Sequence, residues 1–69
     1  MIHIGQLIKE ELERQERTPT WLAKKINCER PNVSYIFQQK SINTDLLMRI
    51  SHALGKNFFE IYYENFENP

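Results

Sequence analysis

The stretch RPNVSYIFQQ, residues 30–39, combines an apolar helical face with side chains suited to the recognition of nucleobases. Val33, Ile36 and Phe37 recur at the spacing of one face of a helix. Arginine can pair with guanine, asparagine and glutamine with adenine, and a tyrosine ring can contact the methyl group of thymine. A face that is merely solvated more often carries glutamate and lysine. The residues that we expect to contact base edges lie opposite the apolar face: Arg30, Pro31, Asn32, Ser34, Tyr35 and Gln38.

Positive charge is concentrated around the same stretch. The formal net charge of the whole chain is zero, yet residues 18–40 contain four lysine and arginine side chains against a single acid, Glu29. Cations, hydroxyls and amides at the ends of helices are suited to the phosphates of a nucleic-acid backbone. The predicted phosphate contacts are Thr18, Thr20, Lys24, Gln39 and Lys40.

Apolar spacing and helix-end residues predict an all-α protein with five helices and no strand. Gly55 is expected to end the fourth helix in a left-handed conformation. Asn57 and Glu60 resemble a capping box that opens the fifth, whereas His3 is expected to lie at a frayed end. The helices are predicted at residues 4–16, 19–26, 29 or 30 to 38, 43 or 44 to 54, and 58–66.

The second and third predicted helices are joined by a turn so short that they must cross steeply. Thr18 can cap the second helix, and Pro19 fits its first position because no amide hydrogen is needed there. Ala23 is small enough for the crossing, and Asn27 tolerates the left-handed backbone that the turn requires. Together with the spacing of the apolar residues, these features predict a helix-turn-helix formed by helices 2 and 3.

The segments WLAKKINCERPNVSYIFQQ and LLMRISHALGKNFFEIY resemble the lambda-repressor-like family of Xre/Cro type transcriptional regulators. The resemblance covers nearly the whole chain and implies a compact five-helix bundle whose third helix reads double-stranded DNA. The family usually has glycine where Asn27 stands, a polar residue where Pro19 stands, and a glycine after helix 3, where this chain reads QQKS. Because proline offers no amide to a phosphate, Thr18 and Thr20 are expected to take over that contact.

The fifth predicted helix has more aromatic surface than one small core needs. One face carries Phe59, Tyr63 and Phe66, which we expect at the seam of a homodimer. The alternative is that the tail folds back and covers helix 1. A dimer would place two recognition helices about one turn of DNA apart, on a near-palindromic operator.

Other functional classes find no support in the residues. The single cysteine, Cys28, and two distant histidines have no metal-ligand spacing, and two glycines fifty positions apart form no phosphate-binding loop. We therefore expect no catalytic residue, no cofactor, no metal and no small-molecule substrate. No apolar run exceeds three residues, which predicts a cytoplasmic protein without a membrane segment.

The sequence thus predicts a single domain, residues 1–69, that acts as a sequence-specific DNA-binding transcriptional regulator of the repressor kind. The alternative is a small helical protein-interaction module, such as an antitoxin or an adaptor, whose third helix faces solvent or another protein.

Overall fold

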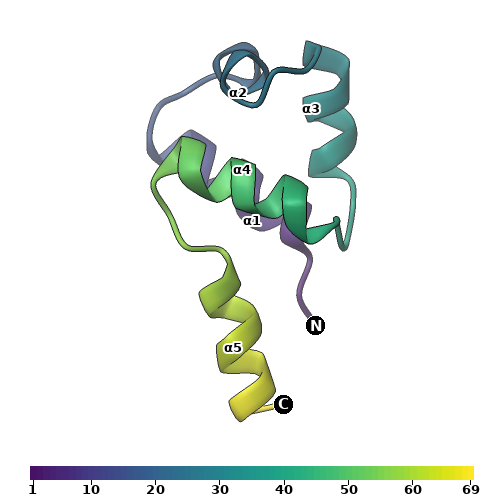
Figure 1. The fold of residues 1–69 in the computed structure, drawn as a ribbon, viewed down its shortest axis with the longest axis vertical. Helices are drawn as coiled ribbons and strands as arrows, with labels where there is room; N and C mark the ends of the chain where they lie inside the picture. The colour runs from purple at the N-terminus through teal and green to yellow at the C-terminus, as the bar shows by residue number, and fades with distance from the viewer.

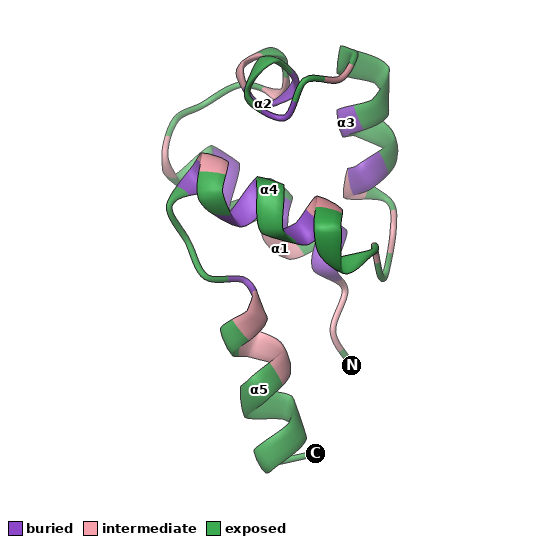
Figure 2. Cartoon of the chain, in the orientation of Figure 1, coloured by how far each residue is buried: buried purple, intermediate pink, exposed green.

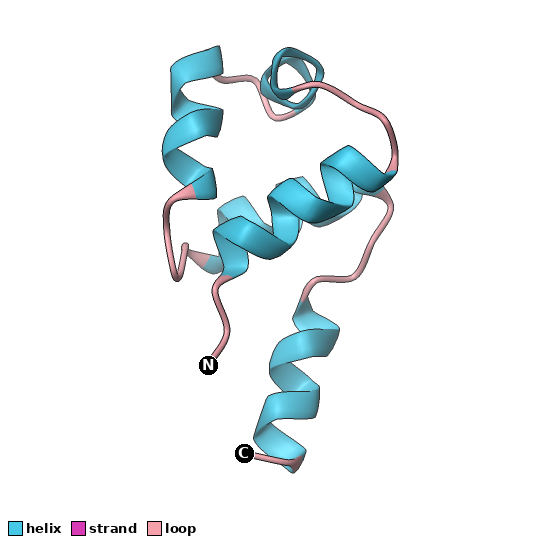
Figure 3. Ribbon diagram, turned by 180° about the vertical axis from the view of Figure 1, so that it is seen from behind, coloured by secondary structure: helices cyan, strands magenta, loops and turns pink.

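Five α-helices make up the chain, and the computed structural model describes all of residues 1–69. The prediction of an all-α fold is confirmed, since helices and loops are the only elements present (Figure 3). α2 and α3 pack closely against each other as a helix-turn-helix (Figure 1). The helices are α1 (Ile4–Arg14), α2 (Pro19–Lys25), α3 (Arg30–Phe37), α4 (Thr44–Leu54) and α5 (Phe59–Glu67).

Three of the helices end in a residue with a left-handed backbone. Asn27 (φ 57°) follows α2 and Gly55 (φ 64°) follows α4, as predicted. α1 ends two residues earlier than the predicted Glu16, because Glu16 itself is left-handed (φ 57°). The amide of Arg17 then reaches back to the carbonyl of Leu12 at 3.0 Å, the bond of a Schellman motif. The residue type could not predict this end of α1, since glutamate rarely adopts a left-handed backbone.

The starts of α1, α2 and α4 are capped by side chains, in part as predicted. Thr18 Oγ1 accepts from the amide of Trp21 at 3.1 Å, and Asn43 Oδ1 accepts from that of Leu46 at 2.7 Å. The expectation for His3 is wrong: its Nδ1 accepts from the Gln6 amide at 3.1 Å, so His3 caps α1.

The capping box predicted at the start of α5 is not formed. Asn57 Oδ1 accepts from the amide of Phe59 at 3.0 Å, two residues on, which is the bond of an Asx-turn. No bond joins the Glu60 side chain to the Asn57 amide, and Phe58 takes the capping position without a side-chain bond. α5 therefore begins at Phe59 rather than at Phe58.

The core lies between α1, α2, α3 and α4 (Figure 2). Phe58, directly before α5, also packs into it. Phe37, which belongs to the predicted apolar face of α3, is only half-buried at the margin of the core, as are Leu7, Leu46 and Cys28. The twelve buried apolar residues are Ile4, Ile8, Leu12, Leu22, Ala23, Ile26, Val33, Ile36, Leu47, Ile50, Leu54 and Phe58.

α5 projects from this core along the long axis of the molecule (Figure 1), whose extents are 35 × 19 × 19 Å. None of its residues is buried. Phe59 and Tyr62 pack against the edge of the core, while Tyr63 is 63% and Phe66 81% exposed. α5 does not cover α1, from which an open groove separates it, so the fold-back alternative is not what the structure adopts.

Candidate nucleic-acid interface

α3 is held against α1 by an unusually close approach of the two backbones. A Cβ atom on Gly5 would lie 2.3 Å from the carbonyl oxygen of Ile36 and 2.5 Å from that of Phe37, so only glycine fits. At the start of α1, the Gly5 amide donates to the Gln39 carbonyl at 2.9 Å and the Ile4 amide to the Lys40 carbonyl at 3.1 Å. Free backbone amides at the start of α1 thus donate to carbonyl oxygens of the chain that leaves α3.

The turn between α2 and α3 is fixed from both sides. The amide of Cys28 donates to the Ala23 carbonyl at 2.9 Å, which closes the turn around the left-handed Asn27. From α4, Arg49 Nη2 donates to the carbonyl of Ile26 and so satisfies the end of α2. Ala23, predicted to lie where the helices cross, is 3% exposed.

The outer face of α3 carries the six residues predicted to read bases, and all six are exposed (Figure 2). Arg30, Pro31, Asn32, Ser34 and Tyr35 lie on the helix, and Gln38 is its C-terminal capping residue. The inner face buries Val33 completely and leaves Ile36 5% exposed.

The polar side chains of this face have no partner within the chain. No side-chain hydrogen bond or ion pair involves Arg30, Asn32, Ser34 or Gln38, nor the hydroxyl of Tyr35. Their donors and acceptors are therefore free to bond to a molecule that contacts this face. A set of guanidinium, amide and hydroxyl groups on a rigid helix can bond to base edges.

The predicted phosphate contacts are not all equally free. They lie at the start of α2 (Thr18, Thr20), near its end (Lys24) and after α3 (Gln39, Lys40). Thr18, Thr20, Lys24 and Lys40 are exposed. The Thr18 oxygen is already an acceptor in the α2 cap, so only its hydrogen is available to a phosphate. Gln39 is half-buried, and its Nε2 lies 3.5 Å from the Tyr35 carbonyl.

Arg17 is a candidate that the sequence reasoning missed. Its guanidinium lies over the ring of Trp21, 4.1 Å from the centroid, directly before the α2 cap. Lys25 approaches the same ring at 5.6 Å. Trp21 therefore holds two cations beside α2. The spacing of four residues on either side of a tryptophan was the signal available in the sequence.

A second missed set comes from α1. His3, Gln6 and Lys9 line one hollow together with Ser34 and Gln38 of the α3 side. The exposed face of α3 therefore continues onto α1, and Lys9 brings a cation to its edge. Sequence alone gave no signal for this, because the neighbourhood results from the docking of two helices that lie far apart in the chain.

No three His, Cys, Asp or Glu residues come together as a group that would hold a metal ion. None of the five helices combines the length and apolar character needed to span a bilayer.

Compared with models of protein families, with curated proteins and with solved structures, the chain matches none.

Proposed function

We propose that this chain is a sequence-specific DNA-binding transcriptional regulator of the lambda-repressor-like kind, acting in the cytoplasm. The observation that carries the proposal is the exposed face of α3, whose polar side chains have no partner within the chain. In this proposal α3 enters the major groove, where each base pair presents a distinct pattern of donors and acceptors.

The neighbouring elements would position α3 by contacts with phosphates. Thr18, Thr20 and Lys24 lie on the α2 side, and Lys40 follows α3. Pro19 lacks an amide hydrogen and the Trp21 amide is taken by the Thr18 oxygen, so Thr20 provides the amide at the start of α2 that is left for a phosphate. Such contacts set register and orientation and do not discriminate between sequences.

Binding is tested by fluorescence anisotropy of labelled genomic fragments, including the upstream region of the gene itself, at two salt concentrations. We expect one fragment to bind more tightly than the others, and all binding to weaken as salt rises. Equal affinity for every fragment would contradict sequence-specific readout, and no binding at low salt would overturn the proposal itself.

Single substitutions then separate base reading from phosphate contact. Arg30→Ala and Gln38→Ala should each lose about 1 to 3 kcal/mol on the preferred site and relax its sequence preference. Lys40→Ala should weaken binding to all sequences alike and reduce the salt slope by about one. If the three variants behave identically on preferred and random DNA, α3 is not the reader.

Assembly as a homodimer is part of the proposal, because one module of this size buries only about 600 to 1,000 Å² of protein surface on DNA. Tyr63 and Phe66 are the exposed aromatic residues of the expected seam. Phe59, the third residue of that set, is half-buried and lines a hollow beside Met48, itself 47% exposed. Two subunits would place their α3 helices about 34 Å apart on a near-palindromic operator.

The dimer is tested by analytical ultracentrifugation of the parent and of the double variant Tyr63→Ala with Phe66→Ala, with and without the preferred DNA. We expect two parent molecules per site and weakened pairing in the double variant. A parent that binds as one molecule per site would contradict the dimer, and so would unchanged pairing of the double variant.

A protein-interaction module remains the second candidate, favoured by the same exposed Tyr63 and Phe66, which suit a protein surface. The two functions differ in the DNA titration. An antitoxin or adaptor that does not read DNA would leave Arg30→Ala without effect on any fragment.

A further inference from the structure

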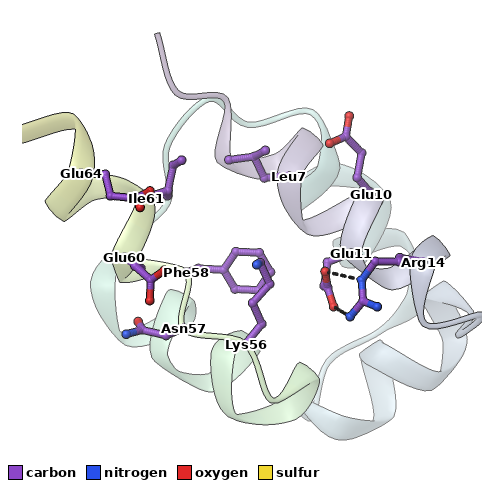
Figure 4. Close-up of a pocket in the computed structure, with 10 residues that line it drawn as sticks. All are labelled: Leu7, Glu10, Glu11, Arg14, Lys56, Asn57, Phe58, Glu60, Ile61 and Glu64. Atoms are coloured by element: carbon purple, nitrogen blue, oxygen red, sulfur yellow. Dashed lines mark hydrogen bonds and ion pairs between the residues drawn. The ribbon is translucent and has the colours of Figure 1, made fainter. Parts of the chain in front are cut away.

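A groove of about 330 Å³ separates α1 from α5 (Figure 4). Its apolar floor is formed by Leu7 of α1, Phe58 before α5 and Ile61 of α5. Phe58 is 2% exposed, and the other two are half-buried. Figure 1 places α5 at the opposite end of the long axis from α2 and α3, so the α5 wall of the groove lies away from the face proposed to read DNA.

Of the two cations at the groove, Arg14 is paired with one buried carboxylate, whereas the Lys56 ammonium forms no ion pair. Arg14 donates from Nε to Glu11 Oε1 at 3.0 Å and from Nη2 to Oε2 at 2.5 Å. Gln15 Nε2 donates to the same Oε2 at 2.7 Å and to the Leu54 carbonyl at 2.8 Å. The hydrogen bonds from Arg14 and Gln15 lower the pKa of Glu11 from 4.5 to about 2, and the charge of Lys56 acts in the same direction.

The remaining carboxylates at the rim form no ion pair. Acids also exceed bases in the groove lining, which contains Glu10, Glu11, Glu60 and Glu64 against Arg14 and Lys56. Glu10, Glu60 and Glu64 line the groove, yet the pair Arg14–Glu11 is the single ion pair of the structure. Glu10 accepts only from the neutral Gln6 amide at 3.2 Å. Glu60 and Glu64 are one helical turn apart and so stand on the same side of α5.

We propose that this groove docks a segment of a partner protein that carries an apolar side chain flanked by lysine or arginine. The floor offers apolar surface to the central side chain, and the three unpaired carboxylates attract the flanking cations. Charge excludes the other occupants. A nucleic-acid backbone would meet carboxylates, and α5 of a second copy would bring Glu60, Glu64 and Glu67 against them.

This docking surface goes beyond DNA binding and is compatible with it. Along α5, Ile61 and Glu64 point about 100° or more away from the stripe of Phe59 and Tyr63, while Glu60 lies between the two sides, about 60° from Tyr63. A basic partner and a second subunit would therefore use different sides of the same helix.

The probe for the test is a short fluorescein-labelled peptide with two leucines one helical turn apart among lysines and arginines, compared with its counterpart that carries glutamates. Fluorescence anisotropy gives the affinity, and NMR chemical-shift changes locate the site. The double variant Glu60→Gln with Glu64→Gln should bind the basic peptide about tenfold more weakly. The matched control, Glu13→Gln with Glu67→Gln, removes the same charge outside the groove and should bind as the parent does.

Ile61→Ser tests the apolar floor, since this side chain is not part of the core cluster. It should weaken the peptide severalfold while the circular dichroism stays that of the parent. The expected shifts lie at Leu7 and Ile61, and the glutamate peptide should not bind.

Several results would overturn the proposal. Equal loss in the control double variant would mean attraction by net charge alone, and shifts centred on Tyr63 and Phe66 would place docking on the aromatic stripe. Concentration-dependent shifts at Ile61 without peptide would mean that a second copy fills the groove. Absence of binding by the basic peptide at low salt would also refute it, whatever the outcome of the DNA titrations.

Discussion

Replacement of Gly5 by alanine should push α3, which carries the exposed polar face, away from α1. The new Cβ would lie 2.3 Å from the Ile36 oxygen and 2.7 Å from the carbonyl carbon of Phe37, and both neighbours are backbone atoms that cannot rotate away. An ordinary contact begins at 3.4 Å, so the start of α1 and the end of α3 must move apart by roughly 1 Å.

The energetic cost follows from what this movement breaks. The bonds from the Gly5 amide to Gln39, at 2.9 Å, and from the Ile4 amide to Lys40, at 3.1 Å, would stretch beyond hydrogen-bond range. Overpacking costs about 1 to 3 kcal/mol and each lost bond about 0.5 to 1.5 kcal/mol. Alanine returns up to about 1 kcal/mol through its helix propensity. These contributions give a net loss of about 1 to 5 kcal/mol in the free energy of unfolding, and we expect a value near the middle of that range, about 3 kcal/mol.

Urea denaturation followed by circular dichroism measures this loss, and a melting curve should shift down by about 10 to 20 °C. The chain offers a matched control in its other glycine. Alanine at Gly55 meets no atom within 4 Å but is strained by the left-handed backbone (φ 64°), which costs about 1 to 2 kcal/mol. Hydrogen exchange distinguishes the two, since only Gly5→Ala should expose the amides of residues 4 and 5.

Two outcomes would refute this reasoning. If Gly5→Ala were as stable as the parent or more so, helix propensity would be acting alone and the close approach would be absent. If it were destabilised while the amides of residues 4 and 5 kept their protection, the loss would come from elsewhere.

Three further substitutions test the rest of the structure. Ala23→Leu should overpack the crossing of α2 and α3 at a cost of about 1 to 3 kcal/mol in urea denaturation, and an unchanged midpoint would place the crossing elsewhere. Asn27→Ala should lose about 1 kcal/mol because of the left-handed backbone (φ 57°), whereas Asn27→Gly should not. Glu11 has its pKa lowered from 4.5 to about 2, so its charge stabilises the fold above pH ~5 and this contribution is lost as the pH falls toward ~2. Glu11→Gln should therefore lower the free energy of unfolding by about 1 to 2 kcal/mol at neutral pH, after allowance for solvent screening at the groove. Near pH 2 the variant and the parent should be equally stable. A difference that does not depend on pH would contradict the assignment.

Much of the fold was predictable because its signals act within a few residues. Thr18 followed by Pro19 starts α2, Asn27 turns the chain after it, and Gly55 ends α4. Each depends on one hydrogen bond or one backbone conformation that the local sequence favours by itself. The apolar spacing similarly predicted which face of α3 is buried and which six residues remain exposed.

Features that join distant parts of the chain were beyond such reasoning. Nothing near Gly5 in sequence shows that Ile36 will approach it, and nothing near Gln15 shows that its amide will bond to the Leu54 carbonyl. The direction of α5 was likewise left open, because its aromatic residues fit either a fold-back or a partner. The amino-acid sequence by itself determined which segments are helical, the ends marked by Thr18, Asn27 and Gly55, and the exposed character of α3. Tertiary structure decided the docking of α1 on α3, the placement of Lys9 beside the α3 face and the groove beside α5, because these depend on packing between helices rather than within one.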